Sequence, residues 1–210
     1  MSNKYGGNLI VILVTYNRAE YTVRTFLSLI KTVPNAKFIF VDNASTDGTR
    51  EAFEKAGYNK NHVVILKEKN EGWGSAVNEA LAYIDFHNLK ADYILVSNND
   101  VEYFDDWYQK AWTLYDKYPQ IGILGLWKHK NHGVIKDYGD LVTKDQMPGT
   151  CWLLRPEVIT YLGPMKENGA CPTKGGNGED VYYCIKAEQN GLWVAGPKED
   201  LAIHLDGYDN

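Results

Sequence analysis

Oxygen-bearing side chains follow a predicted buried strand in the segment VSNNDV (96–101), directly after the apolar run ADYIL. No glycine or proline stands there to make an ordinary turn. Ligands of open α/β sheets bind at the carboxyl ends of the strands, and Mg²⁺ usually binds one or two carboxylates together with phosphates and water. We therefore expect Asp100 to be a candidate cation ligand, with Asn98 supplying a carbonyl oxygen or holding a water. The alternative is a structural role for this aspartate.

Two other predicted strands also end in polar residues. The segment VTYNR closes the first strand and places Thr15, Tyr16, Asn17 and Arg18 at the same edge of the sheet. The second strand ends at Asp42, whose carboxylate could accept a hydrogen bond from a ribose hydroxyl or a base N–H, although a turn or cap is the alternative. Neither G-x-G-x-x-G nor a P-loop follows the first strand, which disfavours a dinucleotide-dependent dehydrogenase and a Walker-type ATPase.

The stretch NEGWGSAVNEAL (70–81) predicts a glycine-containing helix start. Free backbone N–H groups and the helix dipole make such a start suitable for an anion. Asn70 and Gly72 lie in its loop, and Asn78 lies one turn into the helix. A simple glycine cap is an equally good interpretation.

Later in the chain, Glu179 and Asp180 open another predicted helix, after the glycine-rich segment GGNG. The helix dipole favours ionised carboxylates in a first turn, and a fixed carboxylate is a suitable general base. First-turn acids are also common for structural reasons alone. His204, near the end of a short apolar strand, is a second candidate. Asp42, Asp100, Asp180 and His204 each stand at the end of a strand or the start of a helix, where one crevice could bring them together.

Apolar periodicity predicts the elements that position these residues. Continuous apolar runs indicate strands covered on both faces, and helical spacing of apolar residues alternates with them. This alternation predicts an α/β fold, a single domain with a mostly parallel central sheet flanked by helices. The predicted strands are 8–16, 36–42, 63–67, 91–97, 121–127, 150–156, 192–197 and 201–207, with an edge strand or hairpin at 132–140; the predicted helices are 18–33, 45–57, 72–88, 105–119, 157–163 and 179–191.

Composition argues against several classes of protein. The net charge of −5 and the dispersed basic residues argue against a nucleic-acid partner. No apolar run approaches the roughly 20 residues of a membrane span, and the N-terminus does not read as a signal peptide. Cys151, Cys171 and Cys184 form no Cys-x-x-Cys pair, so we expect buried thiols and a reducing, cytoplasmic location rather than a zinc site.

Taken in order, the motifs resemble those of the GT-A inverting glycosyltransferases of family 2, especially the rhamnosyltransferase-like branch. The matching stretches begin with VILVTYNRAEYTVRTFLSL, FIFVDNASTDGT, NEGWGSAVNEAL and YILVSNNDV, and continue with TCWLLRPEVI, GNGEDVYYCIKAEQNGL and AIHLDG. They cover nearly the whole chain, as one GT-A domain over residues 1–210. The resemblance implies that residues 1–100 bind a nucleotide-sugar and that 101–210 form the acceptor and catalytic half. The chain could also be one domain of a longer polypeptide.

The resemblance further implies a metal-dependent transfer of a sugar from a UDP- or dTDP-linked donor to a hydroxyl acceptor such as a glycan, with Mn²⁺ or Mg²⁺ as cofactor. Its Asp-x-Asp element reads Asn98-Asn99-Asp100, so Asp100 and His204 would be the metal ligands. Asp180 would be the catalytic base and Glu179 its neighbour. Independently of the resemblance, we hypothesise that the glycine-rich loop 168–178 is a mobile lid that closes over donor and acceptor. The implied donor-binding residues are Thr15, Tyr16, Asn17, Arg18, Asp42, Asn70, Gly72, Asn78, Asn98, Asn99 and, near the sugar, Trp152.

Three other interpretations stay open on the sequence. A sugar nucleotidyltransferase would carry a glycine-rich basic loop after the first strand, and VTYNRAEY has no glycine. A catalytically silent nucleotide-sugar-binding module fits Asn98 but not the Glu179-Asp180 pair. A nucleic-acid-modifying transferase would need a basic face.

Overall fold

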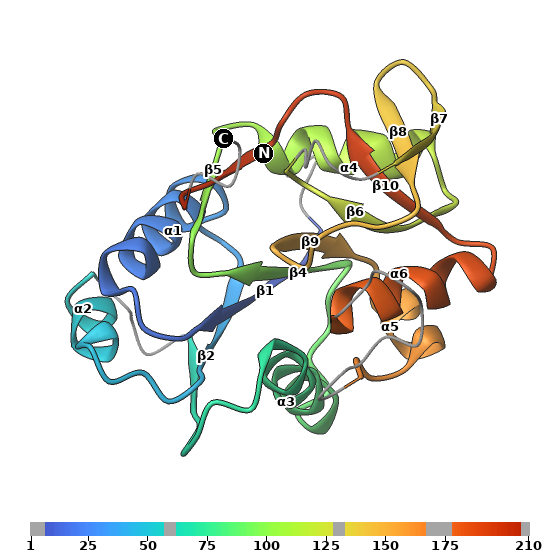
Figure 1. Ribbon diagram of the computed structural model, residues 1–210. Helices are drawn as coiled ribbons and strands as arrows, with labels where there is room; N and C mark the ends of the chain where they lie inside the picture. The colour runs from blue at the N-terminus through green and yellow to red at the C-terminus, as the bar shows by residue number, and fades with distance from the viewer. Residues whose placement is uncertain (1–6, 57–61, 128–132, 167–177, 207–210) are drawn as a thin grey trace.

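Four parallel strands form one half of the main sheet, in the order β3-β2-β1-β4. The computed structural model describes residues 7–56, 62–127, 133–166 and 178–206 (Figure 1). Every residue of β1 is buried, because helices cover both faces of these strands. The predicted strands 8–16, 36–42, 63–67 and 91–97 are thus confirmed. Their bounds are β1 Leu9–Thr15, β2 Lys37–Asp42, β3 Val63–Leu66 and β4 Tyr93–Asn98.

Alternate residues of β1 contribute to two separate apolar cores. Val11 and Leu13 join Phe26 of α1 and Phe53 of α2 in one core. Ile12 faces the opposite way and packs in a core with α3, α5 and α6. The period-two alternation of a strand therefore divides the domain into two helical layers, with α4 on the side of α1 and α2. The helices are α1 Ala19–Thr32, α2 Thr49–Lys55, α3 Trp73–Phe86, α4 Trp107–Lys117, α5 Pro156–Leu162 and α6 Glu179–Gln189.

The second half of the main sheet continues in the order β9-β6-β10-β8-β7. Strand β9 is antiparallel to both β4 and β6, and β8 is antiparallel to both β10 and β7. These two run against the other strands, so the sheet as a whole is mostly parallel, as the sequence predicts. Residues 132–140 contribute the edge strand β7. The bounds are β6 Ile121–Gly125, β7 Val134–Asp137, β8 Leu141–Lys144, β9 Cys151–Leu154 and β10 Trp193–Pro197.

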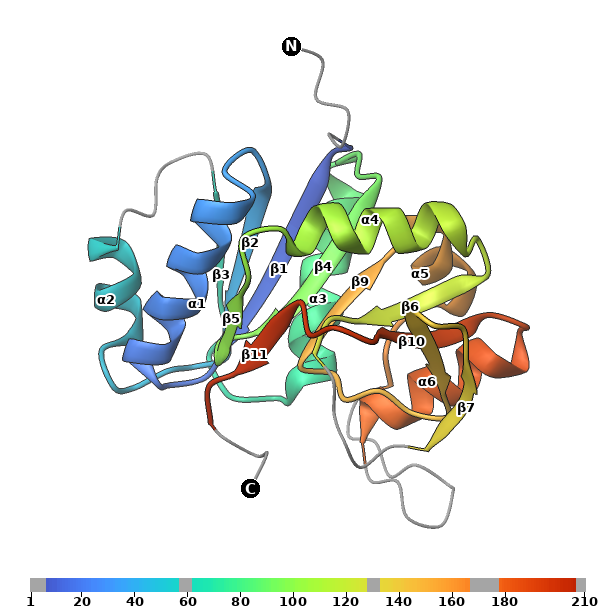
Figure 2. The same ribbon diagram turned by 90° about the horizontal axis from the view of Figure 1, so that it is seen from above.

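A second, two-stranded sheet joins β5 (Val101–Tyr103) to β11 (Ala202–His204) in antiparallel register, with His204 opposite Val101. Figure 2 shows β11 lying against β5, next to the end of β4. The sequence predicts β11 but not β5, because an alternation of only three residues, Val-Glu-Tyr, is too short to indicate a strand. This pairing brings the end of the described chain to the residue that follows Asp100.

Three further expectations concern the cysteines, the basic residues and the glycine-rich loop. Cys151 and Cys184 are buried and free, and burial raises the pKa of the Cys151 thiol to about 12, whereas Cys171 lies outside the described residues.

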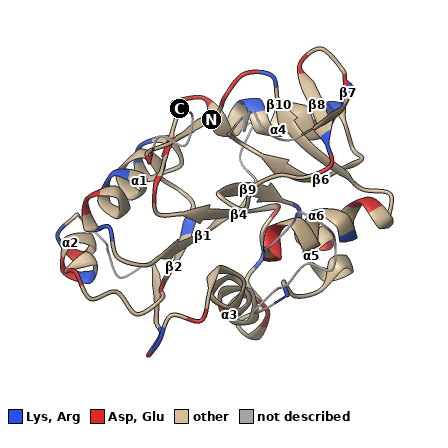
Figure 3. Cartoon of the chain, viewed as in Figure 1, with Lys and Arg blue, Asp and Glu red and all other residues tan. Residues whose placement is uncertain are grey.

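Lys and Arg are dispersed over several elements, including α1, α2, α4 and the β7–β8 hairpin (Figure 3). Most of the predicted lid also falls outside the described residues. In the described ranges, the helices are too short or too polar to span a bilayer.

Candidate functional site

The loop after β1 is held in an uncommon backbone conformation. Asn17 and Arg18 both have positive φ angles, 56° and 64°, which L-residues other than glycine seldom adopt. The Asn17 N–H donates to Oγ of Ser45 at 2.8 Å, and Oδ1 of Asn17 accepts the N–H of Thr46 at 2.8 Å. The loop after β2 therefore fixes the loop after β1 and the direction in which Arg18 leaves it.

Asp47 reinforces the same junction. Its carboxylate accepts hydrogen bonds from the Thr49 N–H at 3.1 Å and from the Ala19 N–H at 3.2 Å. Desolvation would raise the pKa of Asp47, but the hydrogen bonds from the Thr49 hydroxyl and from these backbone N–H groups outweigh it and lower the pKa. The ionised carboxylate thus ties the starts of α1 and α2 together.

Asn99 lies beneath this loop as an internal hydrogen-bonding centre. Its Nδ2 lies 2.7 Å from the Asn17 carbonyl oxygen, 2.9 Å from Oγ1 of Thr15 and 2.8 Å from Oγ1 of Thr22. Thr15 is fully buried and only 7% of Asn99 is exposed. Two predicted donor contacts, Thr15 and Asn99, therefore support the loop from within and offer no surface to a donor. Tyr16, by contrast, is exposed.

Asp100 and His204 meet at the end of β4. Nε2 of His204 lies 3.4 Å from Oδ1 of Asp100, because β11 pairs with β5 directly after Asp100. The ring of His204 stacks on Trp127, with centroids 5.1 Å apart. On the other side, Nη1 of Arg18 donates to Oδ2 of Asp100 at 2.7 Å and also to Oδ2 of Asp206. The predicted pair of metal ligands is thus brought together in space.

The donor set at Asp100 fits a divalent cation bound largely by its substrate. Asp100 is only 6% exposed, and its Oδ1 accepts no hydrogen bond from any described residue. No group of three or more His, Cys, Asp or Glu residues able to hold a metal is found in the described ranges. One carboxylate and one imidazole leave most positions to phosphate and water, and Mg²⁺ is commonly held by one or two carboxylates together with phosphates and several waters.

Asp42 is fully buried at the end of β2. Its Oδ1 accepts the N–H of Ser45 at 3.0 Å, and its Oδ2 accepts a hydrogen bond from Nε of Arg50. Both carboxylate oxygens are therefore engaged by the protein. In this structure the Asp42 side chain shapes the loop between β2 and α2. It is not exposed for the predicted direct contact with a nucleoside.

Asn43, which the sequence reasoning missed, joins that loop to the start of α3. Its Nδ2 donates to Oδ1 of Asn70 at 2.8 Å and to the Gly72 carbonyl at 3.1 Å, and its Oδ1 accepts the Glu71 N–H at 3.2 Å. Gly72 precedes α3 with φ +91°, where a side chain would be strained. The feature of the sequence that could have identified Asn43 is its position directly after Asp42, at the end of the second strand.

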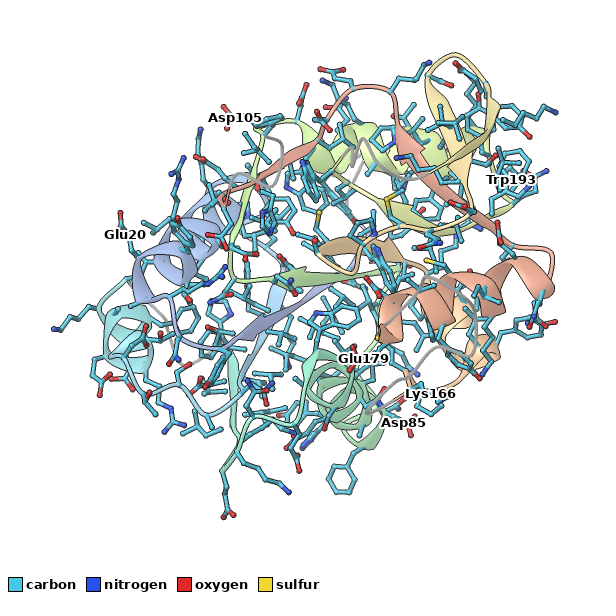
Figure 4. All side chains as sticks on the ribbon, in the orientation of Figure 1. Glu20, Asp85, Asp105, Lys166, Glu179 and Trp193 are labelled. Atoms are coloured by element: carbon cyan, nitrogen blue, oxygen red, sulfur yellow. The ribbon has the colours of Figure 1, made fainter. Side chains whose placement is uncertain are left out.

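Glu179 and Asp180 begin α6 beside the start of α3, and Figure 4 shows Glu179 between these two helices. Oδ2 of Asp180 accepts the Gly149 N–H at 3.0 Å, and its Oδ1 accepts the Val181 N–H at 2.8 Å. A methyl group built on Gly72 would lie 3.2 Å from Oε1 of Glu179. Both carboxylates are therefore held close to neighbouring backbone.

The aromatic residue next to Asp180 is Trp73, which the sequence reasoning did not single out. A Cβ built on Gly149 would lie 3.0 Å from Cη2 of Trp73 and 3.2 Å from Cβ of Asp180. Trp152, predicted to lie near the sugar, is fully buried behind it, with ring centroids 5.5 Å apart. Burial in the core places Trp152 as support for Trp73 and corrects the expectation of direct contact.

Asn78 is also used within the protein. Its Nδ2 donates to the Met165 carbonyl and its Oδ1 accepts the Met165 N–H, both at 2.8 Å. This paired amide bond fastens α3 to the segment after α5. Both polar atoms of the Asn78 amide are therefore engaged within the protein, and its contact with a donor stays a prediction.

The Asp100 and Asp180 groups belong to one edge of the sheet. The Asn98 N–H donates to the Thr150 carbonyl at 2.8 Å, so Gly149, which holds Asp180, lies close to the end of β4. Figure 2 shows this edge, where β4 ends and β9 and α6 begin. The site therefore has the Asp100–His204 pair on one side and the Asp180 carboxylate on the other.

Comparisons with known proteins identify the family of the chain. Residues 10–161 match the family model described as glycosyl transferase family 2. The chain is 36% identical over 93 residues to glycosyltransferase AglJ of Haloferax volcanii, and 26% identical over 136 residues to the uncharacterized glycosyltransferase MG060 of Mycoplasma genitalium. These alignments cover 44% and 62% of this chain, and 27% and 41% of those relatives. The aligned part is thus less than half of each relative.

Solved structures share the fold at low sequence identity. The mannosyltransferase PcManGT of Pyrobaculum calidifontis, in complex with GDP-Man and Mn²⁺, aligns with a TM-score of 0.67 at 18% identity, over 94% of this chain and 56% of that one. S. aureus TarS 1-349 in complex with UDP-GlcNAc aligns with a TM-score of 0.69 at 19% identity, over 93% and 57%. The fold is therefore that of GT-A glycosyltransferases, and the chain, matched over residues 10–161, belongs to glycosyl transferase family 2.

Proposed function

We propose that this domain transfers a sugar from a nucleoside-diphosphate donor to a hydroxyl group of an acceptor, with inversion at the anomeric carbon. Asp180 carries the proposal, because it is an ionisable side chain fixed by the Gly149 N–H at 3.0 Å, close to the end of β4. As general base, Asp180 takes the proton of the acceptor hydroxyl while that oxygen bonds to the anomeric carbon, and the bond from this carbon to the diphosphate oxygen breaks and releases the nucleoside diphosphate. Such assistance contributes roughly 10²–10⁴-fold to the rate.

The donor lies across the carboxyl ends of β1, β2 and β4. The exposed ring of Tyr16 and the loop held by Asn43 form the nucleoside side of the site. The first backbone N–H groups of α3, after Gly72, would bind an anionic group of the donor. We propose a UDP- or dTDP-linked donor, in line with the resemblance to the rhamnosyltransferase-like branch. The neighbours that hold UDP-GlcNAc and GDP-Man support the general donor class.

Asp100 and His204 would hold a divalent cation, Mn²⁺ or Mg²⁺. When bound, such a cation supplies neutralising charge for a departing diphosphate. The two side chains contribute by position: β4 fixes Asp100, and the pairing of β11 with β5 brings His204 to 3.4 Å from it. Neighbours complexed with Mn²⁺ support this choice.

A transfer assay tests the proposal. The domain is incubated with UDP-, dTDP- and GDP-sugars, Mn²⁺ and simple glycoside acceptors, and release of nucleoside diphosphate and product anomer are measured. We expect product of inverted configuration, and a loss of about 10²–10⁴-fold for Asp180→Asn with donor affinity retained. Glu188→Gln, on the same helix, is the matched control and should keep activity. Equal inactivity of the wild type and of Asp180→Asn, with donor still bound, would favour a silent nucleotide-sugar-binding module.

A further inference from the structure

One guanidinium group links three distant parts of the chain at the cation side of the site. Nη1 of Arg18 donates to Oδ2 of Asp100 at 2.7 Å and to Oδ2 of Asp206. These partners are 82 and 188 residues away in the sequence. Arg18 therefore places a positive charge next to the carboxylate to which the proposed function assigns a divalent cation.

The backbone is shaped to deliver this charge. Arg18 is in the left-handed conformation at φ 64° and ψ 53°, directly before α1. A residue other than glycine seldom adopts this conformation, and such backbone strain collects at functional positions. The hydrogen bond from Nδ2 of Asn99 to the Asn17 carbonyl, at 2.7 Å, holds the preceding residue in place. The direction of Arg18 is thus imposed by its surroundings.

The buried carboxylate of Asp100 requires a counter-charge, and it cannot turn into solvent. Its side chain is 9% exposed, and a buried carboxylate without a cation is costly. The Arg18 side chain is 46% exposed, so it can turn into solvent without disrupting the core. The anion is therefore permanent at this position, and the cation is exchangeable.

From these contacts we propose that Arg18 is a built-in counter-cation that competes with a divalent metal ion for Asp100. The inference rests on the proposed function for the identity of the competing ion. Arg18 neutralises Asp100 and holds it beside Asp206 when no metal is bound, and it yields Oδ2 of Asp100 when a metal binds. A metal ion must then displace Arg18 from Asp100 in order to bind, so Arg18 lowers the affinity of the site for the metal.

Direct Mn²⁺ titration, followed by the electron paramagnetic resonance signal of free Mn²⁺, tests this without any sugar transfer. Arg18→Asn removes the guanidinium and keeps a residue that tolerates the left-handed conformation. We expect it to bind Mn²⁺ about tenfold more tightly than the wild type. Arg24→Asn is the matched control, because it removes the same charge from an α1 residue paired with Glu102. It should stay within about twofold of the wild type. Asp100→Asn added to Arg18→Asn should abolish binding.

The competition can also be followed in the wild-type protein. With diamagnetic Mg²⁺, the side-chain nitrogen resonances of Arg18 should shift as the pair with Asp100 opens, while those of Arg24 stay in place. Four results would each overturn the proposal. They are equal Mn²⁺ affinity of Arg18→Asn and Arg24→Asn, weaker binding by Arg18→Asn, no binding by either protein, and an unchanged Arg18 resonance. Failure of sugar transfer with tighter Mn²⁺ binding by Arg18→Asn would count against the proposed function alone.

Discussion

The carboxylate of Asp180 is joined to the backbone of Gly149 by a hydrogen bond of 3.0 Å from the Gly149 N–H to Oδ2. This bond connects the first turn of α6 to the segment that enters β9, next to the end of β4. The orientation of the proposed general base therefore depends on a residue with no functional group of its own.

Gly149→Ala should lower turnover by about tenfold or more, because a small displacement of a catalytic group is costly. The new Cβ would lie 3.0 Å from Cη2 of Trp73 and 3.2 Å from Cβ of Asp180, too close for both to stay in place. Initial rates at saturating donor measure the effect. Gly133→Ala, whose Cβ would lie no closer than 3.5 Å to Asp145, is the control. Unchanged turnover in both variants would show that the position of Asp180 does not depend on Gly149.

Asn99→Ala should destabilise the fold by about 1–3 kcal/mol, because buried partners of Nδ2 lose their donor. It should also weaken donor binding, since the loop at Asn17 loses its anchor. Urea unfolding and calorimetric titration with nucleotide measure the two effects. Asn190→Ala, which removes only a local bond to the Lys186 carbonyl at the exposed end of α6, should change stability by about 0.5 kcal/mol or less. A donor affinity that survives Asn99→Ala would argue against the role of this loop.

Mn²⁺ together with a nucleoside diphosphate should raise the melting temperature of the wild type. At a concentration about a hundredfold above Kd, ligand binding stabilises by about 2.7 kcal/mol, which is about 5–10 °C for a domain of this size. Asp100→Asn should lose most of the shift, and chelation by EDTA should reverse it. Asp105→Asn, at an exposed position paired with Lys31, should keep the shift. The same rise in the presence of EDTA would exclude a metal contribution to binding.

Asp47→Ala should cost about 0.5–1 kcal/mol at neutral pH, in the lower part of the range for lost helix caps, since Asp47 is exposed. The pKa of Asp47 is lowered in the folded state from its ordinary value of 3.8. The stabilisation is therefore complete above about pH 5 and is lost as the pH falls through the folded pKa, below 3.8. Chemical unfolding of both proteins at pH 7 and pH 3 tests this. A difference that stays constant between these pH values would contradict the assignment.

The sequence sufficed for the parts of the molecule that depend on apolar patterning. Buried runs such as 8–16 and 91–97 mark strands, and the polar residues after them mark one edge of the sheet. Asp100 and His204 were expected to converge, and their side chains lie 3.4 Å apart. The short strand β5 could not be predicted, because its pairing is decided by β11, about a hundred residues later.

Side-chain direction was the harder part of the site. Asn78, Asn99 and Trp152 have residue types suited to ligands, and each stands at a suitable position. An amide bonds as well to a backbone carbonyl as to a sugar, and an indole packs as well in a core as against a ring. Only the packed structure decides between these uses. The bond between Asn78 and Met165 joins positions 87 residues apart, and no local pattern encodes it.

The place of β10 in the main sheet has a consequence for how the protein folds. It lies between β6 and β8, so the earlier β7–β8 hairpin has no route to the rest of the sheet until residues 193–197 insert. Pairings this distant in sequence slow folding, because the entropy of loop closure is lost before the contact forms. We expect the parallel half to assemble first. Until β10 arrives, two unprotected strand edges would then be available for mispairing with other chains.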